Sequence, residues 1–152
     1  MTFHFRAVTP KPTTLDLEAR TIEAIIATSA PVARPGFTEI LDMRGADLSR
    51  LIGGPVLDGH LSVSTRDQLG IIEEAEVRNA ELWARLKFRS NPAATAVLTD
   101  ISDGTIRGLS VGYSVQKFAD TGAKDQRIRT ITKWTPIEAS IAPVPADPGA
   151  HF

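Results

Sequence analysis

Cysteine is absent from this chain of 152 residues, and so is any marked excess of charge of one sign. Without cysteine the protein can form no disulfide, no zinc–thiolate site and no cysteine nucleophile. Lysine and arginine number 17 against 18 aspartate and glutamate residues, a net charge of −1, so no surplus draws the chain to nucleic acid or to an anionic membrane. Apolar runs stay well short of the roughly 18 residues that a membrane helix needs. We therefore expect no nucleic-acid partner and no membrane partner.

Motifs that bind cofactors are missing as well. The sequence has no Walker-type phosphate loop and no dinucleotide-binding fingerprint. Its three histidines form neither an H-x-x-x-H nor an H-x-E pattern, so they do not indicate a zinc site. The start, MTFHFRAVTPKPTT, lacks the apolar run of a signal peptide. We expect a protein without cofactor or metal that is made and used in a cytoplasm.

Most of the pattern that is present is typical of β-strands. With 42% hydrophobic residues, the chain is long enough for one domain with its own core, residues 1–152. Short segments rich in β-branched residues and bounded by turn residues indicate strands. We expect strands at 21–28, 37–43, 69–77, 81–88, 106–118, 127–134 and 137–144, with 69–77 and 81–88 forming a hairpin and Pro136 interrupting the chain before the last segment.

Two segments carry helix signals. In SNPAATAVLTDISDG (90–104), Ser90 or Asn91 can cap a helix, Pro92 suits its first turn and Gly104 suits the position after its end. The segment ADLSRLIG (46–53) predicts a second, short helix that the following glycines and proline end. The predicted fold class is therefore β-rich α+β, a single domain with a mostly antiparallel sheet or barrel and a few helices.

A serine between two glycines marks the long strand expected at 106–118. The stretch GLSVG, from Gly108 to Gly112, fits the G-x-S-x-G pattern around the nucleophile of α/β-hydrolases. In a strand, Leu109 and Val111 face the core, while Ser110 shares the other face with the two glycines, which leave a notch beside its hydroxyl. Short matches of this kind also arise by chance, in which case Ser110 is an ordinary serine on a sheet face.

The α/β-hydrolase interpretation fails on other grounds. That fold needs a strand–turn–helix elbow at the serine and a histidine later in the chain. Here YSVQKF continues the strand after Ser110, and only His151 follows, at an end that we expect to fray. A serine nucleophile still needs a base, usually histidine. His4 lies in a strand-like N-terminal stretch, so His60, at the end of a short apolar segment, is the candidate; a surface-loop histidine is the alternative.

Three stretches carry a resemblance to a known family. They are GPVLDGHLSVSTRDQLGIIEEAEV, LWARLKFRSNPAATAVLTDISDGTIRGLSVGYSV and WTPIEASIAPVPADPGA. In this order they resemble the prohead (capsid-maturation) proteases of tailed phages and gene transfer agents, over nearly the whole chain. These proteases are thought to share a fold with the herpesvirus assemblin proteases, so the resemblance implies an assemblin-like fold.

The resemblance implies a serine endopeptidase. Ser110 would attack the scissile carbonyl, His60 would take its proton and return it to the leaving amine, and backbone N–H groups near 143–146 would hold the oxyanion. The substrate would be a scaffold or the precursor of the major capsid protein, cut inside the assembling procapsid in the host cytoplasm, and the protease would also cut itself. The alternative is a catalytically inactive capsid-assembly or scaffolding domain that kept the protease fold.

A third residue is expected to orient the histidine. The herpesvirus relatives use a second histidine, but the corresponding place here holds TPIEASIAP. Alternation puts Glu138 on the face opposite the apolar residues of this strand, where a carboxylate needs a partner. We predict that His60 is this partner, which gives a Ser110–His60–Glu138 triad. The alternatives are an ion pair between Glu138 and Lys133, and Asp58 as the orienting carboxylate.

Self-association is expected to be weak. Because the assemblin relatives work as dimers, a homodimer is possible. The chain offers only modest apolar surface for one, with Trp83, Trp134 and Phe118 as the candidate contacts.

Overall fold

The structure, a computed structural model, describes residues 14–152, so the stretch around His4 lies outside the described residues. Its strands are β1 (Thr21–Thr28), β2 (Val32–Arg34), β3 (Phe37–Leu41), β4 (Pro55–Asp58), β5 (Gln68–Arg78), β6 (Glu81–Phe88), β7 (Leu109–Thr121) and β8 (Ile128–Ile141). One α-helix, α1 (Pro92–Ser102), and two 3-10 turns, Met43–Gly45 and Thr65–Asp67, complete the described secondary structure. Within residues 14–152, no helix has the length and apolar character needed to span a membrane.

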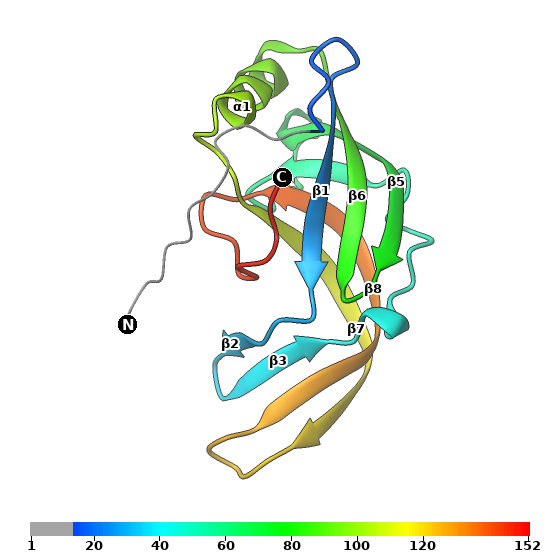
Figure 1. Ribbon diagram of the computed structural model, residues 1–152, viewed down its shortest axis with the longest axis vertical. Coiled ribbons are helices and arrows are strands. Elements are labelled where there is room, and N and C mark those ends of the chain that lie inside the picture. The colour runs from blue at the N-terminus through cyan, green and yellow to red at the C-terminus, as the bar shows by residue number, and fades with distance from the viewer. Residues whose placement is uncertain (1–13) are drawn as a thin grey trace.

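The eight strands form one curled sheet with α1 across one end (Figure 1). The order is β1-β6-β5-β4-β8-β3-β2, and β7 also pairs with β8. Strand β8 pairs antiparallel with β7 along its whole length, and on its other edge it pairs parallel with β3 at residues 128–131 and with β4 at residues 139–141. The sheet is therefore mixed and not mostly antiparallel as expected. The expectation was wrong on this point because alternation along a strand shows which face is buried but not the direction of a distant partner.

Several elements lie where the sequence predicts them. Strand β1 has the predicted bounds, and β5 and β6 form the predicted hairpin. In α1 the side chain of Asn91 accepts a hydrogen bond from the Ala94 N–H at 3.1 Å, which caps the helix. Gly104 follows the helix with φ +77°, a conformation that glycine adopts readily.

The helix predicted at 46–53 is absent. The segment forms successive turns, in which Leu51 N–H bonds to Leu48 O and Gly54 N–H to Leu51 O. The Asp47 side chain accepts a hydrogen bond from the Ser49 N–H at 3.0 Å. This local side-chain-to-backbone bond competes with a helix, which explains why the apolar periodicity of the segment does not decide its structure.

The break predicted at Pro136 is also absent, because β8 runs through it without interruption. Pro136 pairs with Tyr113 of β7 next to a register shift, since the preceding pair joins Gly112 to Glu138. A proline donates no backbone hydrogen bond, and strands accommodate it at such bulges. The bulge therefore lets a single strand carry both Trp134 in the core and Glu138 beyond the proline.

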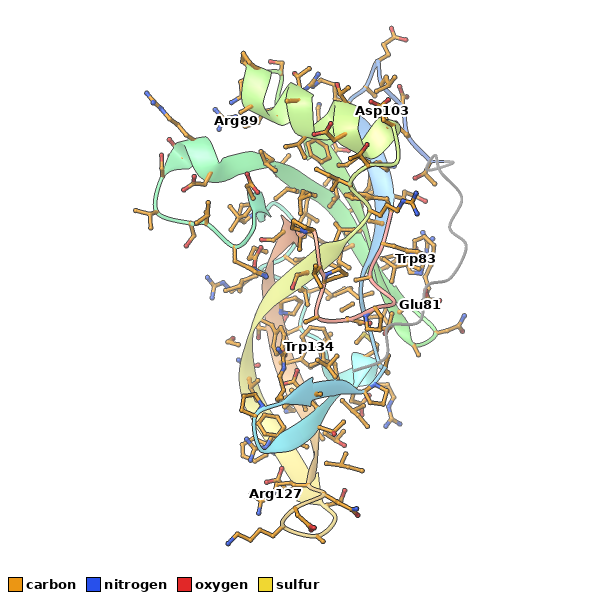
Figure 2. The ribbon with its side chains drawn as sticks, turned by 90° about the vertical axis from the view of Figure 1, so that its left-hand side faces the viewer. Glu81, Trp83, Arg89, Asp103, Arg127 and Trp134 are labelled. Carbon is orange, nitrogen blue, oxygen red and sulfur yellow. The ribbon has the colours of Figure 1, made fainter. Side chains whose placement is uncertain are left out.

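Trp134 lies in the core and not on the surface, contrary to its suggested role in self-association. Its side chain is fully buried, and its indole N–H donates to the Asp42 carbonyl at 2.9 Å. Figure 2 shows Trp134 in the middle of the molecule, while Arg127 lies near the far end of the β7–β8 hairpin. Of the other two candidates, Phe118 is 51% exposed and Trp83 is partly buried. The burial of Trp134 in the core explains why β8 contains a tryptophan among its charged residues.

The end of the described chain is tied down, so the expectation of fraying at His151 was wrong. His151 forms bridges with Ile25 of β1 and with Gly108, just before β7. Both its N–H and its carbonyl bond to Ile25, each at 2.9 Å. Before it, the Asp147 carboxylate accepts hydrogen bonds from the Thr28 N–H and hydroxyl and from the Gly149 N–H. The segment 147–151 therefore spans from the end of β1 to the start of β7.

Replacing Asp147 by alanine should loosen this closure. Three donors lose a carboxylate acceptor, so we expect the free energy of unfolding to fall by about 1 to 3 kcal/mol. Urea unfolding of Asp147→Ala against the parent protein measures the change. Asp125→Ala, a turn residue with an exposed side chain, is the matched control and should change stability by less than about 0.5 kcal/mol. Equal effects for the two variants would show that the carboxylate does not hold the segment.

Candidate active site

The histidine at the end of β4 occupies a tight turn with unusual backbone angles. Gly59 and His60 have φ values of +54° and +64°, and the Leu61 N–H bonds to the Asp58 carbonyl at 3.0 Å. Positive φ at both central residues is typical of a type I′ turn. Left-handed backbone is uncommon outside glycine, although histidine adopts it more often than most residues. The turn leaves 47% of the His60 side chain exposed.

Two hydrogen bonds anchor this turn to the end of β8. The Gly59 N–H donates to the Ile141 carbonyl, and the His60 N–H donates to the hydroxyl oxygen of Ser140, both at 3.0 Å. Because β4 pairs in parallel with β8 at residues 139–141, the two strands end side by side. The parallel pairing that the sequence did not predict is therefore what delivers His60 to β8.

Glu138 of β8 is the carboxylate that the histidine meets. Its Oε1 contacts His60 Nδ1, and its Oε2 accepts a hydrogen bond from the Ser140 hydroxyl at 2.6 Å. Glu138 is only 8% exposed, so its charge is compensated by one partner on each oxygen. Among residues 14–152, no ion pair joins it to Lys133 and no hydrogen bond engages the exposed Asp58 side chain. The geometry thus favours Glu138 as the carboxylate partner of His60.

The second glycine of GLSVG makes room for this carboxylate. Gly112 pairs with Glu138 across β7 and β8, and a Cβ built on Gly112 would lie 2.2 Å from Glu138 Oε1. The first glycine has a similar role, since a Cβ on Gly108 would lie 2.5 Å from the Ala142 carbonyl and 2.7 Å from Pro145 Cδ. The two glycines therefore admit neighbouring groups on both sides of Ser110, which is the notch that the alternation argument predicted.

Ser110 lies between these glycines, half-buried, and pairs with Ser140. Directly opposite residues in antiparallel strands have Cβ atoms about 4.5 to 5.5 Å apart on one face. Ser110 therefore shares a sheet face with Ser140 and Glu138. Within the described residues no hydrogen bond joins the Ser110 hydroxyl to His60. Such bonds are often long in free enzymes and tighten when substrate is bound.

A second polar cluster close to Ser110 was missed in the sequence. The Tyr113 hydroxyl and the Arg34 guanidinium both contact Oε1 of Glu39, which is 8% exposed. Burial and the hydrogen bond to Glu39 raise the pKa of Tyr113 to about 12. These three residues border a cavity of about 30 Å³ that Ser110 also lines. The three residues of the cluster come from three different strands, β2, β3 and β7, so no local sequence motif predicts it.

Metal-binding geometry is not seen in the part of the chain that the structure describes. No group of three or more His, Asp or Glu side chains between residues 14 and 152 is arranged to hold a metal ion.

Comparison with known proteins connects this geometry to a family. Residues 60–152, which include His60, Ser110 and Glu138, match the family described as caudovirus prohead serine protease. The chain is also 36% identical over 123 residues to a protein named major capsid protein from Halomonas phage phiHAP-1. That alignment covers 78% of this chain and 20% of the relative, so the chain spans about a fifth of the length of the curated relative it matches. No solved structure matches the chain.

Gly112→Ala should displace the Glu138 carboxylate. The added Cβ would overlap Oε1, so we expect a loss of about 1 to 3 kcal/mol in the free energy of unfolding. A double-mutant cycle with Glu138→Ala identifies the cause, because removal of the carboxylate should relieve most of the overlap and leave an interaction energy of about 1 kcal/mol or more. An equal cost of Gly112→Ala in both backgrounds would mean that the glycine is needed for another reason.

Proposed function

The chain belongs to the caudovirus prohead serine protease family, and from this membership we propose that it is a serine endopeptidase with Ser110 as nucleophile, His60 as general base and Glu138 as orienting carboxylate. The observation that carries the proposal is the contact of His60 Nδ1 with a buried carboxylate on the strand next to Ser110. A serine hydroxyl is a weak nucleophile until a neighbouring base accepts its proton.

The contacts of the imidazole support one assignment of its two nitrogens. Because Nδ1 faces Glu138, the proposal places the proton of the neutral ring on Nδ1 and leaves Nε2 as the basic nitrogen. In this proposal Nε2 takes the Ser110 proton as Oγ attacks the scissile carbonyl carbon. The imidazolium that forms is stabilised by the Glu138 carboxylate.

The remaining steps return every group to its starting state. The imidazolium gives its proton to the departing amine when the C–N bond breaks, leaving the acyl group on Ser110. Water then attacks the ester carbonyl, with His60 as base once more. The acid product leaves as the proton returns to Ser110 Oγ. No co-reactant other than water is required.

The oxyanion would be held by the loop after β8. In residues 143–146, Pro143 and Pro145 have no N–H, so only Val144 and Ala146 can donate from the backbone. Neither N–H bonds to another group in the described part of the chain, and Pro145 lies against Gly108, close to Ser110. An oxyanion hole needs free N–H donors directed at the negative charge that develops in the transition state. One such donor stabilises the transition state by roughly 3 kcal/mol.

The proposed substrate is a capsid protein precursor or scaffold in the assembling procapsid, with cleavage of the protease itself as a second reaction. Support comes from the family description and from the relative named major capsid protein. An assemblin-like fold and a single domain over residues 1–152 belong to the same proposal.

A second candidate is a capsid-assembly domain that keeps the fold without the activity. The lack of a hydrogen bond between Ser110 and His60 in the described residues is the observation that favours it. The two candidates differ in whether Ser110 reacts, and this can be measured without knowledge of the natural substrate.

Ser110→Ala should abolish both proteolysis and labelling. A fluorophosphonate probe reacts with activated serines, so mass spectrometry of the labelled chain should locate the adduct on Ser110. His60→Ala should lose as much activity as Ser110→Ala, because members of a nucleophile–base unit act together. Ser114→Ala, an exposed serine on the same strand, is the control and should keep labelling. Persistent cleavage by a folded Ser110→Ala variant, or no adduct on the parent chain, would contradict the proposal.

Glu138→Gln should keep the fold and lower kcat/KM by roughly 10² to 10⁴, because the amide no longer stabilises the imidazolium. Asp58→Asn should cost much less, since the exposed Asp58 side chain makes no hydrogen bond in the described structure. Steady-state cleavage of a capsid-precursor peptide by the two variants provides the comparison. A larger loss for Asp58→Asn would assign the orienting role to Asp58 instead.

A further inference from the structure

Ser140 is the residue at which the three strands of the site meet. It pairs with Ser110 on β7 along one edge of β8 and with Leu57 on β4 along the other. Its exposed surface is 0%, so bulk solvent does not reach its hydroxyl. A buried hydroxyl of this kind contributes to a unique arrangement only when both its donor and its acceptor capacity are used.

Both capacities are used, and each serves one member of the proposed triad. The Ser140 hydroxyl donates to Glu138 Oε2 at 2.6 Å and accepts from the His60 backbone N–H at 3.0 Å. Because the single hydroxyl proton is directed to Oε2, the other carboxylate oxygen remains for His60 Nδ1. One side chain thus fixes the acid and the backbone of the base in one hydrogen-bonded chain.

The backbone of His60 needs this support. A non-glycine residue at φ +64° lies in a sparsely populated region that persists only where neighbouring groups hold it. The turn bond from Leu61 to Asp58 and the Gly59 bond to β8 hold the residues on either side. The bond to Ser140 Oγ is the one made by the His60 N–H itself.

Ser140 is not a second nucleophile. Its hydroxyl is closed off from solvent, its proton is engaged by a carboxylate, and among residues 14–152 no imidazole nitrogen bonds to it. Ser110 is the half-buried hydroxyl of the cross-strand pair. The two serines therefore have different roles although they face each other across β7 and β8.

We infer that Ser140 is a positioning residue, which holds the Glu138 carboxylate and the His60 turn in the arrangement needed for proton transfer. The inference deepens the proposed function and rests on it for the effect on catalysis. Its structural part, that Ser140 sets the His60–Glu138 contact, can be measured on the protein whether or not the protein cleaves a substrate.

The direct readout is the Nδ1 proton of His60 in the full chain. An imidazole proton held by a carboxylate gives a far-downfield ¹H NMR signal, which His60→Ala should remove and thereby assign. Ser140→Ala should shift or broaden this signal, because Glu138 loses the donor on Oε2 and the turn loses its acceptor. Ser114→Ala, which removes an exposed hydroxyl from β7, should leave the signal in place.

The kinetic readout separates positioning from substrate binding. Ser140→Ala should lower kcat by about 10- to 100-fold with KM nearly unchanged, as expected for a lost hydrogen bond to a charged group. Ser140→Cys replaces the hydroxyl by a somewhat larger thiol, which is a weaker donor, and should lie between the parent and Ser140→Ala in both readouts. The cysteine variant also keeps the test open if Ser140→Ala does not fold.

The outcomes distinguish the two proposals. An altered Nδ1 signal in Ser140→Ala, in a protein that cleaves nothing and takes no fluorophosphonate, would support the positioning role and reject the protease function. An active parent whose folded Ser140→Ala and Ser140→Cys variants keep both the signal and kcat would overturn the positioning role and leave the protease function intact.

Discussion

The need to compensate one buried charge shapes the centre of this molecule. Glu138 is 8% exposed, and a carboxylate taken out of water is tolerated only with donors on its oxygens. Ser140 supplies one donor from the same strand and His60 the other from the end of β4. Gly112 supplies the space, since any side chain there would occupy the position of the carboxylate. The GLSVG motif, the turn at Gly59 and His60, and residues 138–140 all help to accommodate this one buried carboxylate.

The charge of Glu138 can be compensated because β8 has a partner strand on each of its edges. Its pairing with β7 puts Glu138 opposite Gly112, and its parallel pairing with β4 brings the Gly59–His60 turn to the same place. If β4 ran antiparallel to β8, its first residue, Pro55, would lie beside the Glu138 carboxylate in place of the turn that follows Asp58. The direction of this one pairing therefore decides whether His60 and Glu138 meet, and the mixed sheet is a requirement of the site.

Local features were predictable from the sequence, and long-range pairings were not. Alternation and turn chemistry, which act over a few residues, predict the cap at Asn91, the glycine that follows the helix at Gly104, the β5–β6 hairpin and the face occupied by Glu138. The parallel β4–β8 pairing, the bulge that accommodates Pro136 and the bridges made by His151 depend on segments far apart in the chain. The Ser110–His60–Glu138 assignment rests on the family resemblance together with alternation, because spacing alone does not distinguish His60 from a histidine in a surface loop.

The same connectivity explains why these residues have no separate energetic contributions. Gly112, Ser140 and the His60 turn all act on the position of one carboxylate, so a change at any of them alters the contacts of the others. Substitutions that share a partner are not additive, so the sum of their individual effects exceeds the effect of removing all of these contacts together. A residue that supports the fold alone would behave differently, because its effect on stability would be independent of Glu138. Dependence on Glu138, and not the size of a single effect, is therefore the property that separates the residues of the site from the rest of the sheet.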